Sequence, residues 1–266
     1  MIQKFRDFAR WSKPYTDRYG TMSGVRLALE IRRASWVNSR GTVTSLHVPE
    51  LAYPIAVRSR SSDLKVVDQI FLERQAHFPV AGAPRAIIDA GANIGLSSVV
   101  LATRFPEAHI VALEINRSNY ELLVANTSRY PNIEPRLCGL WSEVANLQIL
   151  NPDAEEWAFR ADRTDAGSEG EDHIPAVGVA DLLEEFGDGD IDLLKIDVEG
   201  SEIEIFESGA ETWLRRVRQL AIECHDRIRP GCSKAVITAA AAHQFSISNW
   251  GEYLLMSRLA DACGRR

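Results

Sequence analysis

The 266-residue sequence lacks the marks of several large classes of protein. It has no apolar run of the roughly 18–20 residues that a membrane-spanning helix needs. Its first residues, MIQKFRDFARWSKPY, contain no apolar stretch typical of a secretory signal, so we expect a cytoplasmic protein without a membrane span. Its four cysteines form no CxxC pair, which argues against both a zinc site and a disulfide framework.

Basic and acidic residues are distributed unevenly. Residues 1–40 hold nine Lys and Arg against three Asp and Glu, whereas the rest of the chain holds 21 against 34, and the net charge is −7. A nucleic-acid-binding protein of this size is usually basic overall, so we expect no nucleic-acid partner. The basic segment is typical of a solvated helix face or of an arm packed on an acidic body. Docking on an acidic partner or a membrane surface is the alternative.

Residues 1–80 predict a small α+β appendage. Apolar residues at helical spacing in SGVRLALEIRRASWV indicate an amphipathic helix, and two β-rich runs at 42–48 and 53–58 indicate a hairpin. A further helix follows, with Ser62 or Asp63 as its cap.

Residues 81–266 predict one domain in which strands and helices alternate. Strands are expected at 86–89, 109–113, 133–140, 191–196 and 220–223, and helices at 96–103, 118–128, 179–186 and 202–207. Apolar strands that alternate with helices are typical of a doubly wound parallel sheet. FSISNW and EYLLMS flank Gly251 and predict an antiparallel pair at one edge. The acidic segment 151–173 is expected to be a solvated loop or, alternatively, a lid.

The segment IIDAGANIGLSS, which starts at Ile87, places an acid and two glycines at the end of a buried strand. Gly91 and Gly95 would let the backbone approach a ligand closely, and the helix that follows offers free N–H groups. Asn93 replaces the second glycine of the dinucleotide fingerprint GxGxxG, and no Gly-Lys-Ser/Thr follows as in a P-loop. The turn therefore favours S-adenosylmethionine over NAD, with Asp89 placed to hold the donor's ammonium group or a water near it.

The next strand, in IVALEIN, ends at Glu114. A carboxylate at this point can accept hydrogen bonds from both ribose hydroxyls of the cofactor. Dinucleotide sites carry the same carboxylate, so Glu114 alone does not discriminate between the two cofactors.

A second group of polar residues follows the fourth and fifth strands of the alternating pattern, in LLKIDVEGSEIEIF and LAIECH. Its members are Lys195, Asp197, Glu199, Glu202, Glu223 and His225. Both strand ends open on the crevice beside the cofactor. Four acids, a lysine and a histidine in one crevice are costly unless chemistry uses them, although Glu199 and Glu202 could simply favour a helix N-terminus.

In order and spacing, five segments resemble the FkbM family of S-adenosylmethionine-dependent methyltransferases. They are SSDLKVVDQIF, IIDAGANIGLSS, IVALEIN, IDLLKIDVEGSEIEIFESGA and IECH, of which KIDVEGSE is the most specific part. The resemblance implies a class I methyltransferase (Rossmann-like) α/β fold, with a doubly wound, mostly parallel sheet and an antiparallel C-terminal edge. It also implies O-methylation of a hydroxyl on a small molecule, saccharide, glycolipid or other natural product.

The chain departs from the family's pattern after the second strand of the alternating pattern, where the family more often has Glu-Pro and this chain has Glu114-Ile115. The ribose contact is left intact, whereas the wall around the adenine is altered. Trp141 and Ser142, after the third strand, are expected neighbours of the adenine.

Methyl transfer to an alcohol, whose pKa is about 15, needs a base or a metal ion. His225 is the expected base because the ordinary pKa of histidine is about 6.5. Asp197, Glu199 and Glu223 complete the predicted catalytic group. Asp197 and Glu223 are also candidate ligands of a divalent metal such as Mg²⁺, and the alternative is that they orient His225 without a metal.

Three other functions stay open at this point. An N- or C-methyltransferase would use the same fold. A nicotinamide-dependent oxidoreductase is disfavoured by the glycine turn, and a non-catalytic nucleotide-binding module would not need the acids and the histidine. The identity of the acceptor and the oligomeric state, with a homo-oligomer as one option, are not determined by these segments.

Overall fold

The computed structural model describes residues 2–37, 39–150, 161–163 and 173–259. The chain forms two compact units, Met1–Arg74 and Gln75–Arg266. Within the described residues, no helix combines the length and the apolar character that crossing a membrane requires.

The first unit contains two helices, a hairpin and a short helical segment. They are α1 (Ile2–Tyr19), α2 (Thr21–Trp36), β1 (Val43–Leu46), β2 (Ile55–Arg58), α3 (Asp63–Val67) and a π-helical turn (Asp68–Leu72). The expected amphipathic helix and hairpin are present, whereas α1 was not predicted as a separate helix. Basic side chains of the helices have acidic partners within the unit: Arg26 pairs with Glu30, and Arg18 with Glu50.

The second unit is built on a seven-stranded sheet with the order β12-β13-β11-β10-β3-β4-β5. These strands are β3 (Ala86–Ala90), β4 (His109–Glu114), β5 (Ile133–Leu137), β10 (Leu193–Ile196), β11 (Gln219–Glu223), β12 (Phe245–Trp250) and β13 (Tyr253–Arg258). β3, β4, β5, β10 and β11 are parallel, and β13 runs antiparallel to both of its neighbours. The predicted doubly wound sheet with an antiparallel edge is confirmed.

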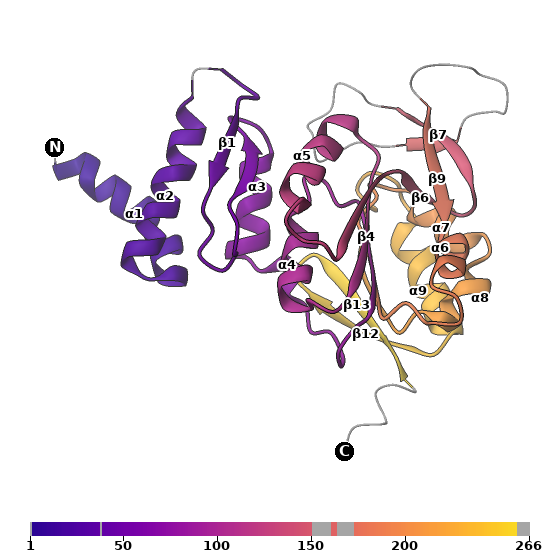
Figure 1. Ribbon diagram of the computed structural model, residues 1–266. Coiled ribbons are helices and arrows are strands. Elements are labelled where there is room, and N and C mark those ends of the chain that lie inside the picture. The colour runs from indigo at the N-terminus through magenta and orange to yellow at the C-terminus, as the bar shows by residue number, and fades with distance from the viewer. Residues whose placement is uncertain (1, 38, 151–160, 164–172, 260–266) are drawn as a thin grey trace. The chain divides into compact units, whose positions relative to one another are not determined.

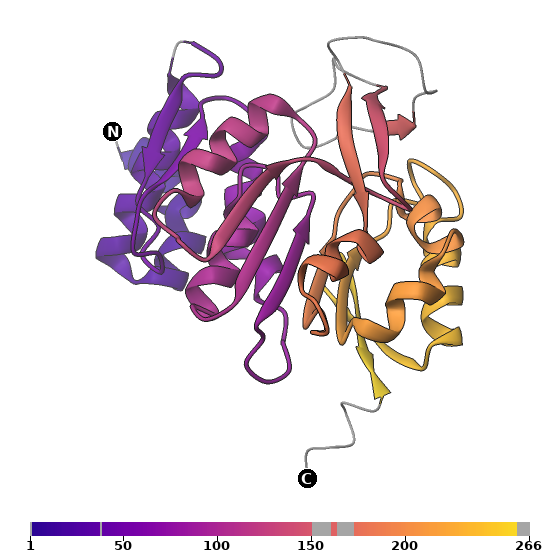
Figure 2. The same ribbon diagram turned by 45° about the vertical axis from the view of Figure 1, so that its right-hand side comes forward.

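Helices cover both faces of this sheet (Figures 1 and 2). α4 (Leu96–Arg104) and α5 (Arg117–Thr127) lie on one face. The other face carries α6 (Val179–Glu185), α7 (Glu202–Glu207), α8 (Ala210–Trp213) and α9 (Cys232–Ala242), whose buried residues form the main hydrophobic core with the strands. The strand order reverses between β3 and β10, so the carboxyl ends of these two strands border the switch point where such sheets bind ligands.

The strand predicted at 133–140 is in fact two strands. β5 ends at Leu137, which pairs with Glu114, the last residue of β4. The backbone N–H of Cys138 makes the final hydrogen bond of this pairing, to the carbonyl of Glu114. The chain then enters a second sheet of four strands in the order β6-β9-β7-β8, which the sequence did not predict. Its strands are β6 (Gly139–Trp141), β7 (Ala145–Ile149), β8 (Ala161–Arg163) and β9 (Ile174–Gly178).

The expected loop at 151–173 is described only in part. Residues 161–163 form β8, whereas 151–160 and 164–172 lie outside the described residues. The expectation of a solvated loop or a lid therefore stays a prediction.

Candidate active site

Asp89 lies at the end of β3 and is fully buried. It faces Lys195 of β10, its direct partner in the register of the two strands, and the Lys195 Nζ lies 2.9 Å from Asp89 Oδ1. The hydroxyls of Ser97 and Ser98, in the first turn of α4, donate to Asp89 Oδ2 at 2.5 and 2.6 Å. Oδ2 thus accepts two hydrogen bonds, whereas Oδ1 has the ion pair to Lys195 but no hydrogen bond. The contact of Asp89 with the donor stays a prediction.

The turn after β3 has a left-handed backbone at three residues: φ is 76° at Gly91, 52° at Asn93 and 86° at Gly95. A Cβ atom on Gly91 would lie 1.8 Å from the backbone oxygen of Asp197, and one on Gly95 would lie 2.7 Å from Cδ1 of Leu123. Gly91 is therefore required by the chain's own packing against backbone, not only by the approach of a ligand as the sequence suggested, whereas the neighbour of Gly95 is the end of a leucine side chain. Asn93 Oδ1 is buried without a hydrogen-bond partner, so the turn retains one unused acceptor.

Glu114, at the end of β4, connects the two loops at this edge of the sheet. Its Oε2 accepts the backbone N–H of Asn93 at 2.8 Å, and its Oε1 accepts that of Asn116 at 2.7 Å. The residue is 5% exposed, and burial raises the pKa of its carboxyl to about 7 although these two hydrogen bonds and a third from the side chain of Asn119 lower it. A carboxylate has about four lone-pair sites, so these three hydrogen bonds leave room for one further donor.

The four acids predicted at the ends of β10 and β11 surround His225, which is 1% exposed, whereas Lys195 pairs with Asp89. His225 Nδ1 lies 2.7 Å from Glu202 Oε1. Its Nε2 lies 3.6 Å from one carboxylate oxygen each of Asp197, Glu199 and Glu223. At 3.6 Å these three are ion pairs and not hydrogen bonds, and Nε2 has no hydrogen-bond partner.

The carboxylates around His225 change its proton affinity. Burial lowers the pKa of His225, but the hydrogen bond to Glu202 and the charges of Glu199 and Asp197 outweigh it and raise the pKa to about 9. These neighbours favour the protonated form of the ring, and the role of His225 as the base stays a prediction. Burial raises the pKa of Glu199 to about 7, and burial together with the charge of Asp197 raises that of Glu223.

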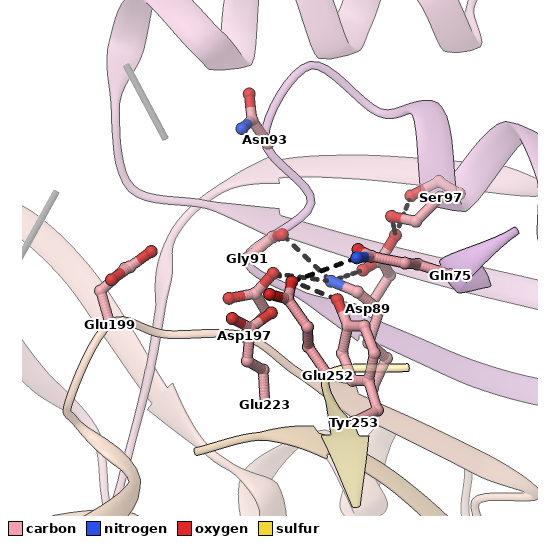
Figure 3. A network of polar contacts seen from close by, with 12 residues as sticks. Gln75, Asp89, Gly91, Asn93, Ser97, Asp197, Glu199, Glu223, Glu252 and Tyr253 are labelled. Carbon is pink, nitrogen blue, oxygen red and sulfur yellow. Dashed lines mark hydrogen bonds and ion pairs between the residues drawn. The ribbon is translucent and has the colours of Figure 1, made fainter. Parts of the chain in front are cut away.

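Residues that the sequence did not assign to the site also contact it, as Figure 3 shows. The hydroxyl of Tyr253 donates to Asp197 Oδ2 at 3.2 Å, and Gln75 Nε2 donates to Glu252 Oε2 at 3.1 Å. Tyr253 lies opposite Glu223 in the register of β11 and β13. The edge strand was predicted, but nothing in EYLLMS indicated that the side chain of Tyr253 reaches the cluster.

The two expected neighbours of the adenine lie on the second sheet. Trp141 is 4% exposed and packs with Leu147 and Ala176 in a small apolar cluster, and Ser142 directly follows β6. Packing accounts for the burial of Trp141, and the adenine contact of both residues stays a prediction.

The family model for the methyltransferase FkbM domain matches residues 89–251. The match spans more than half of the chain and includes the glycine turn, Glu114 and the cluster around His225. The chain therefore belongs to the FkbM family of S-adenosylmethionine-dependent methyltransferases, and the class I fold that the sequence resemblance implied is confirmed.

The AMB antimetabolite synthetase AmbE of Pseudomonas aeruginosa is similar to this chain: it is 27% identical over 201 residues, which cover 61% of this chain and 10% of that protein. Methyltransferase sdnD of Sordaria araneosa is 29% identical over 168 residues, which cover 52% of this chain and 65% of that protein. The chain thus spans less than two thirds of either relative. A solved structure, methyltransferase FkbM from Methylobacillus flagellatus, is 14% identical with a TM-score of 0.44, covering 96% of this chain and 59% of that one.

Proposed function

We propose that the protein transfers a methyl group from S-adenosylmethionine to a hydroxyl of a small-molecule acceptor, with saccharides, glycolipid headgroups and other natural products as the expected classes. The observation that carries this proposal is the position of the acid cluster. A Cβ on Gly91 would touch the backbone of Asp197, so the glycine turn and the first acid of the cluster are in direct contact. Groups that could accept a proton therefore stand next to the turn expected to hold the donor.

The residues at the ends of β3 and β4 fit S-adenosylmethionine. Asn93 Oδ1 is an unused buried acceptor suited to an ammonium group. Glu114 offers its remaining lone pair to a ribose hydroxyl. α4 begins at this turn without a side-chain cap, which leaves backbone N–H groups for a carboxylate. When bound, the cofactor supplies a methyl group on a positively charged sulfur; the carbon bonds to the acceptor oxygen, and the electron pair of the broken C–S bond stays on sulfur.

The hydroxyl proton must pass to a group of this chain, and we assign that role to the carboxylate of Glu199. Its Oε2 is buried and has no hydrogen-bond partner. The residue adopts a left-handed backbone with φ of 52°, a conformation that costs a non-glycine residue about 1–2 kcal/mol. Strain of this kind persists where the surroundings hold a side chain in a required direction. His225 has its Nδ1 committed to Glu202 and its Nε2 turned into the cluster, which leaves Glu199 better placed than His225.

Methyl transfer with ¹³C-labelled S-adenosylmethionine tests the proposal. The protein would be incubated with a panel of mono- and disaccharides, polyols, phenols and matched amines, and the product would be identified by NMR. We expect label on oxygen. Label on nitrogen or carbon would keep the family assignment and overturn O-methylation.

The buried carboxyl of Glu114 should make cofactor binding depend on pH. A ribose hydroxyl donates to the carboxylate, so the ligand favours the ionised form and lowers a pKa that stands at about 7 in the free protein. The affinity for S-adenosylhomocysteine should therefore rise between pH 6 and 8, by up to about tenfold per pH unit below the free-protein pKa, with release of a proton on binding. Calorimetry in buffers of different ionisation enthalpy measures both quantities.

Glu114→Gln is the control for this pH dependence. The variant keeps the shape of the side chain but cannot ionise, so its affinity should be lower by roughly 1–3 kcal/mol and should not change over this pH range. An affinity that rises with pH equally in both proteins would remove Glu114 from the cofactor site.

A further inference from the structure

One ring nitrogen of His225 is buried, lacks a hydrogen-bond partner and faces carboxylates. Nε2 stands 3.6 Å from Asp197 Oδ1 and 3.6 Å from Glu223 Oε1. A direct hydrogen bond between such groups would be about 2.7–3.2 Å long. Two donor atoms that bind one metal ion at about 2.0–2.2 Å are separated by about 3.0–3.6 Å when the angle between the bonds is about 90–120°. The spacing therefore suits atoms that share a cation better than atoms that share a proton.

The other ring nitrogen of His225 carries the partner expected of a metal-binding histidine. Glu202 is fully buried, and its Oε1 lies 2.7 Å from Nδ1. Metal-binding histidines almost always donate the N–H of their second ring nitrogen to a carboxylate, a carbonyl or a water, which fixes the tautomer and directs the free nitrogen at the ion. Glu202 is the first residue of α7, where a negative charge is favourable, as the sequence suggested. Its contact with His225 gives it a second role.

Solvent reaches the cluster from the side of the two partly exposed acids. The side chains of Asp197 and Glu223 are 27% and 16% exposed, whereas that of His225 is 1% exposed. Lys195, the nearest lysine, lies 3.9 Å from Asp197 but 2.9 Å from Asp89, so its charge is shared with another acid. The cluster thus combines a fixed nitrogen, accessible oxygens and an excess of negative charge.

We propose that Asp197, Glu223 and His225 bind one divalent first-row transition-metal ion of the Mn²⁺ type, with Glu202 as the residue that orients His225. One donor atom from each of the three residues lies within 4.8 Å of those of the other two. Because one ligand is an imidazole nitrogen, the set favours Mn²⁺ or its neighbours over the Mg²⁺ that the carboxylates alone suggested. Three protein ligands leave positions open for water or a hydroxyl of the acceptor. That last role rests on the proposed function, whereas the binding of the ion does not.

Titration of the chelator-treated full chain with Mn²⁺, followed by the EPR signal of free Mn²⁺, tests the site without donor or acceptor. We expect one Mn²⁺ per chain. His225→Gln and Asp197→Asn should each weaken binding by at least tenfold, and Glu202→Gln by about 10–100-fold, the usual loss for an orienting partner. Glu207→Gln is the matched control: it removes an exposed acid at the end of α7 that is not in the ligand set, and binding should stay within about threefold.

A second measurement on the unaltered protein covers the case in which a variant fails to fold. Pulsed EPR of bound Mn²⁺ should show coupling to one imidazole nitrogen. Absence of binding at millimolar Mn²⁺, absence of nitrogen coupling, or equal affinity in His225→Gln would each overturn the site. Failure of methyl transfer in a protein that binds Mn²⁺ as expected would count against the proposed function and leave the metal site standing.

Discussion

Replacement of Glu199 by glutamine should lower kcat by about 10²–10⁴, the range for loss of a general base. Glutamine keeps the size of the side chain but cannot take the hydroxyl proton at the buried Oε2 position. Binding of S-adenosylhomocysteine should change less than about threefold, because the turn after β3 and Glu114 are untouched. Steady-state kinetics with an acceptor that the unaltered protein methylates give kcat, and calorimetry on the same variant gives the affinity for S-adenosylhomocysteine.

Glu207→Gln serves as the control for Glu199→Gln. Glu207 is an exposed acid at the end of α7, so the same chemical change there should leave kcat unaltered. If Glu199→Gln keeps full turnover, the proton passes to another group, and Glu223 becomes the next candidate because its carboxylate is partly exposed.

Gly91→Ala should destabilise the protein by about 3–5 kcal/mol. The new Cβ would lie 1.8 Å from the backbone oxygen of Asp197, and only a displacement of the backbone could relieve this clash. In addition, φ at Gly91 is 76°. The left-handed backbone contributes about 1–2 kcal/mol and the overpacking about 1–3 kcal/mol or more. Urea unfolding gives the free energy of unfolding. If the variant folds, displacement of Asp197 should also weaken Mn²⁺ binding.

Gly209→Ala separates the two contributions. Gly209 has nearly the same φ, 77°, but an added Cβ would have nothing within 4 Å. This variant should therefore lose only the conformational part, about 1–2 kcal/mol. Equal losses at Gly91 and Gly209 would show that the contact between the turn and Asp197 is not close in solution.

The sequence predicted the elements of the sheet because each strand is short, apolar and followed by a turn or a helix. It did not predict the break at Cys138, since a continuous run from Ile133 to Leu140 looks like one strand, and only the pairing with β4 decides where it ends. The second sheet was missed for a related reason. Its strands are short, and their partners lie far apart in the chain, as in the pairing of Gly139 with Ala176.

The residue types of the candidate site were also evident from the sequence, but their partners were not. For Asp89, the sequence does not show that β10 places Lys195 directly opposite it. His225 looks like an ordinary base from the sequence, which does not show that its Nδ1 contacts the carboxylate of Glu202 at the start of α7. Both cases turn on contacts across the sheet edge, which depend on register and on buried charge rather than on spacing along the chain.

Calorimetric titration of the protein with S-adenosylmethionine, S-adenosylhomocysteine and NAD tests whether the turn after β3 and Glu114 bind the methyl donor. We expect one site per chain for the first two ligands, weakened by Glu114→Ala, and no binding of NAD at the same concentrations. Binding of NAD in preference to S-adenosylmethionine, or binding of either sulfur ligand with unchanged affinity in the Glu114→Ala variant, would contradict this assignment.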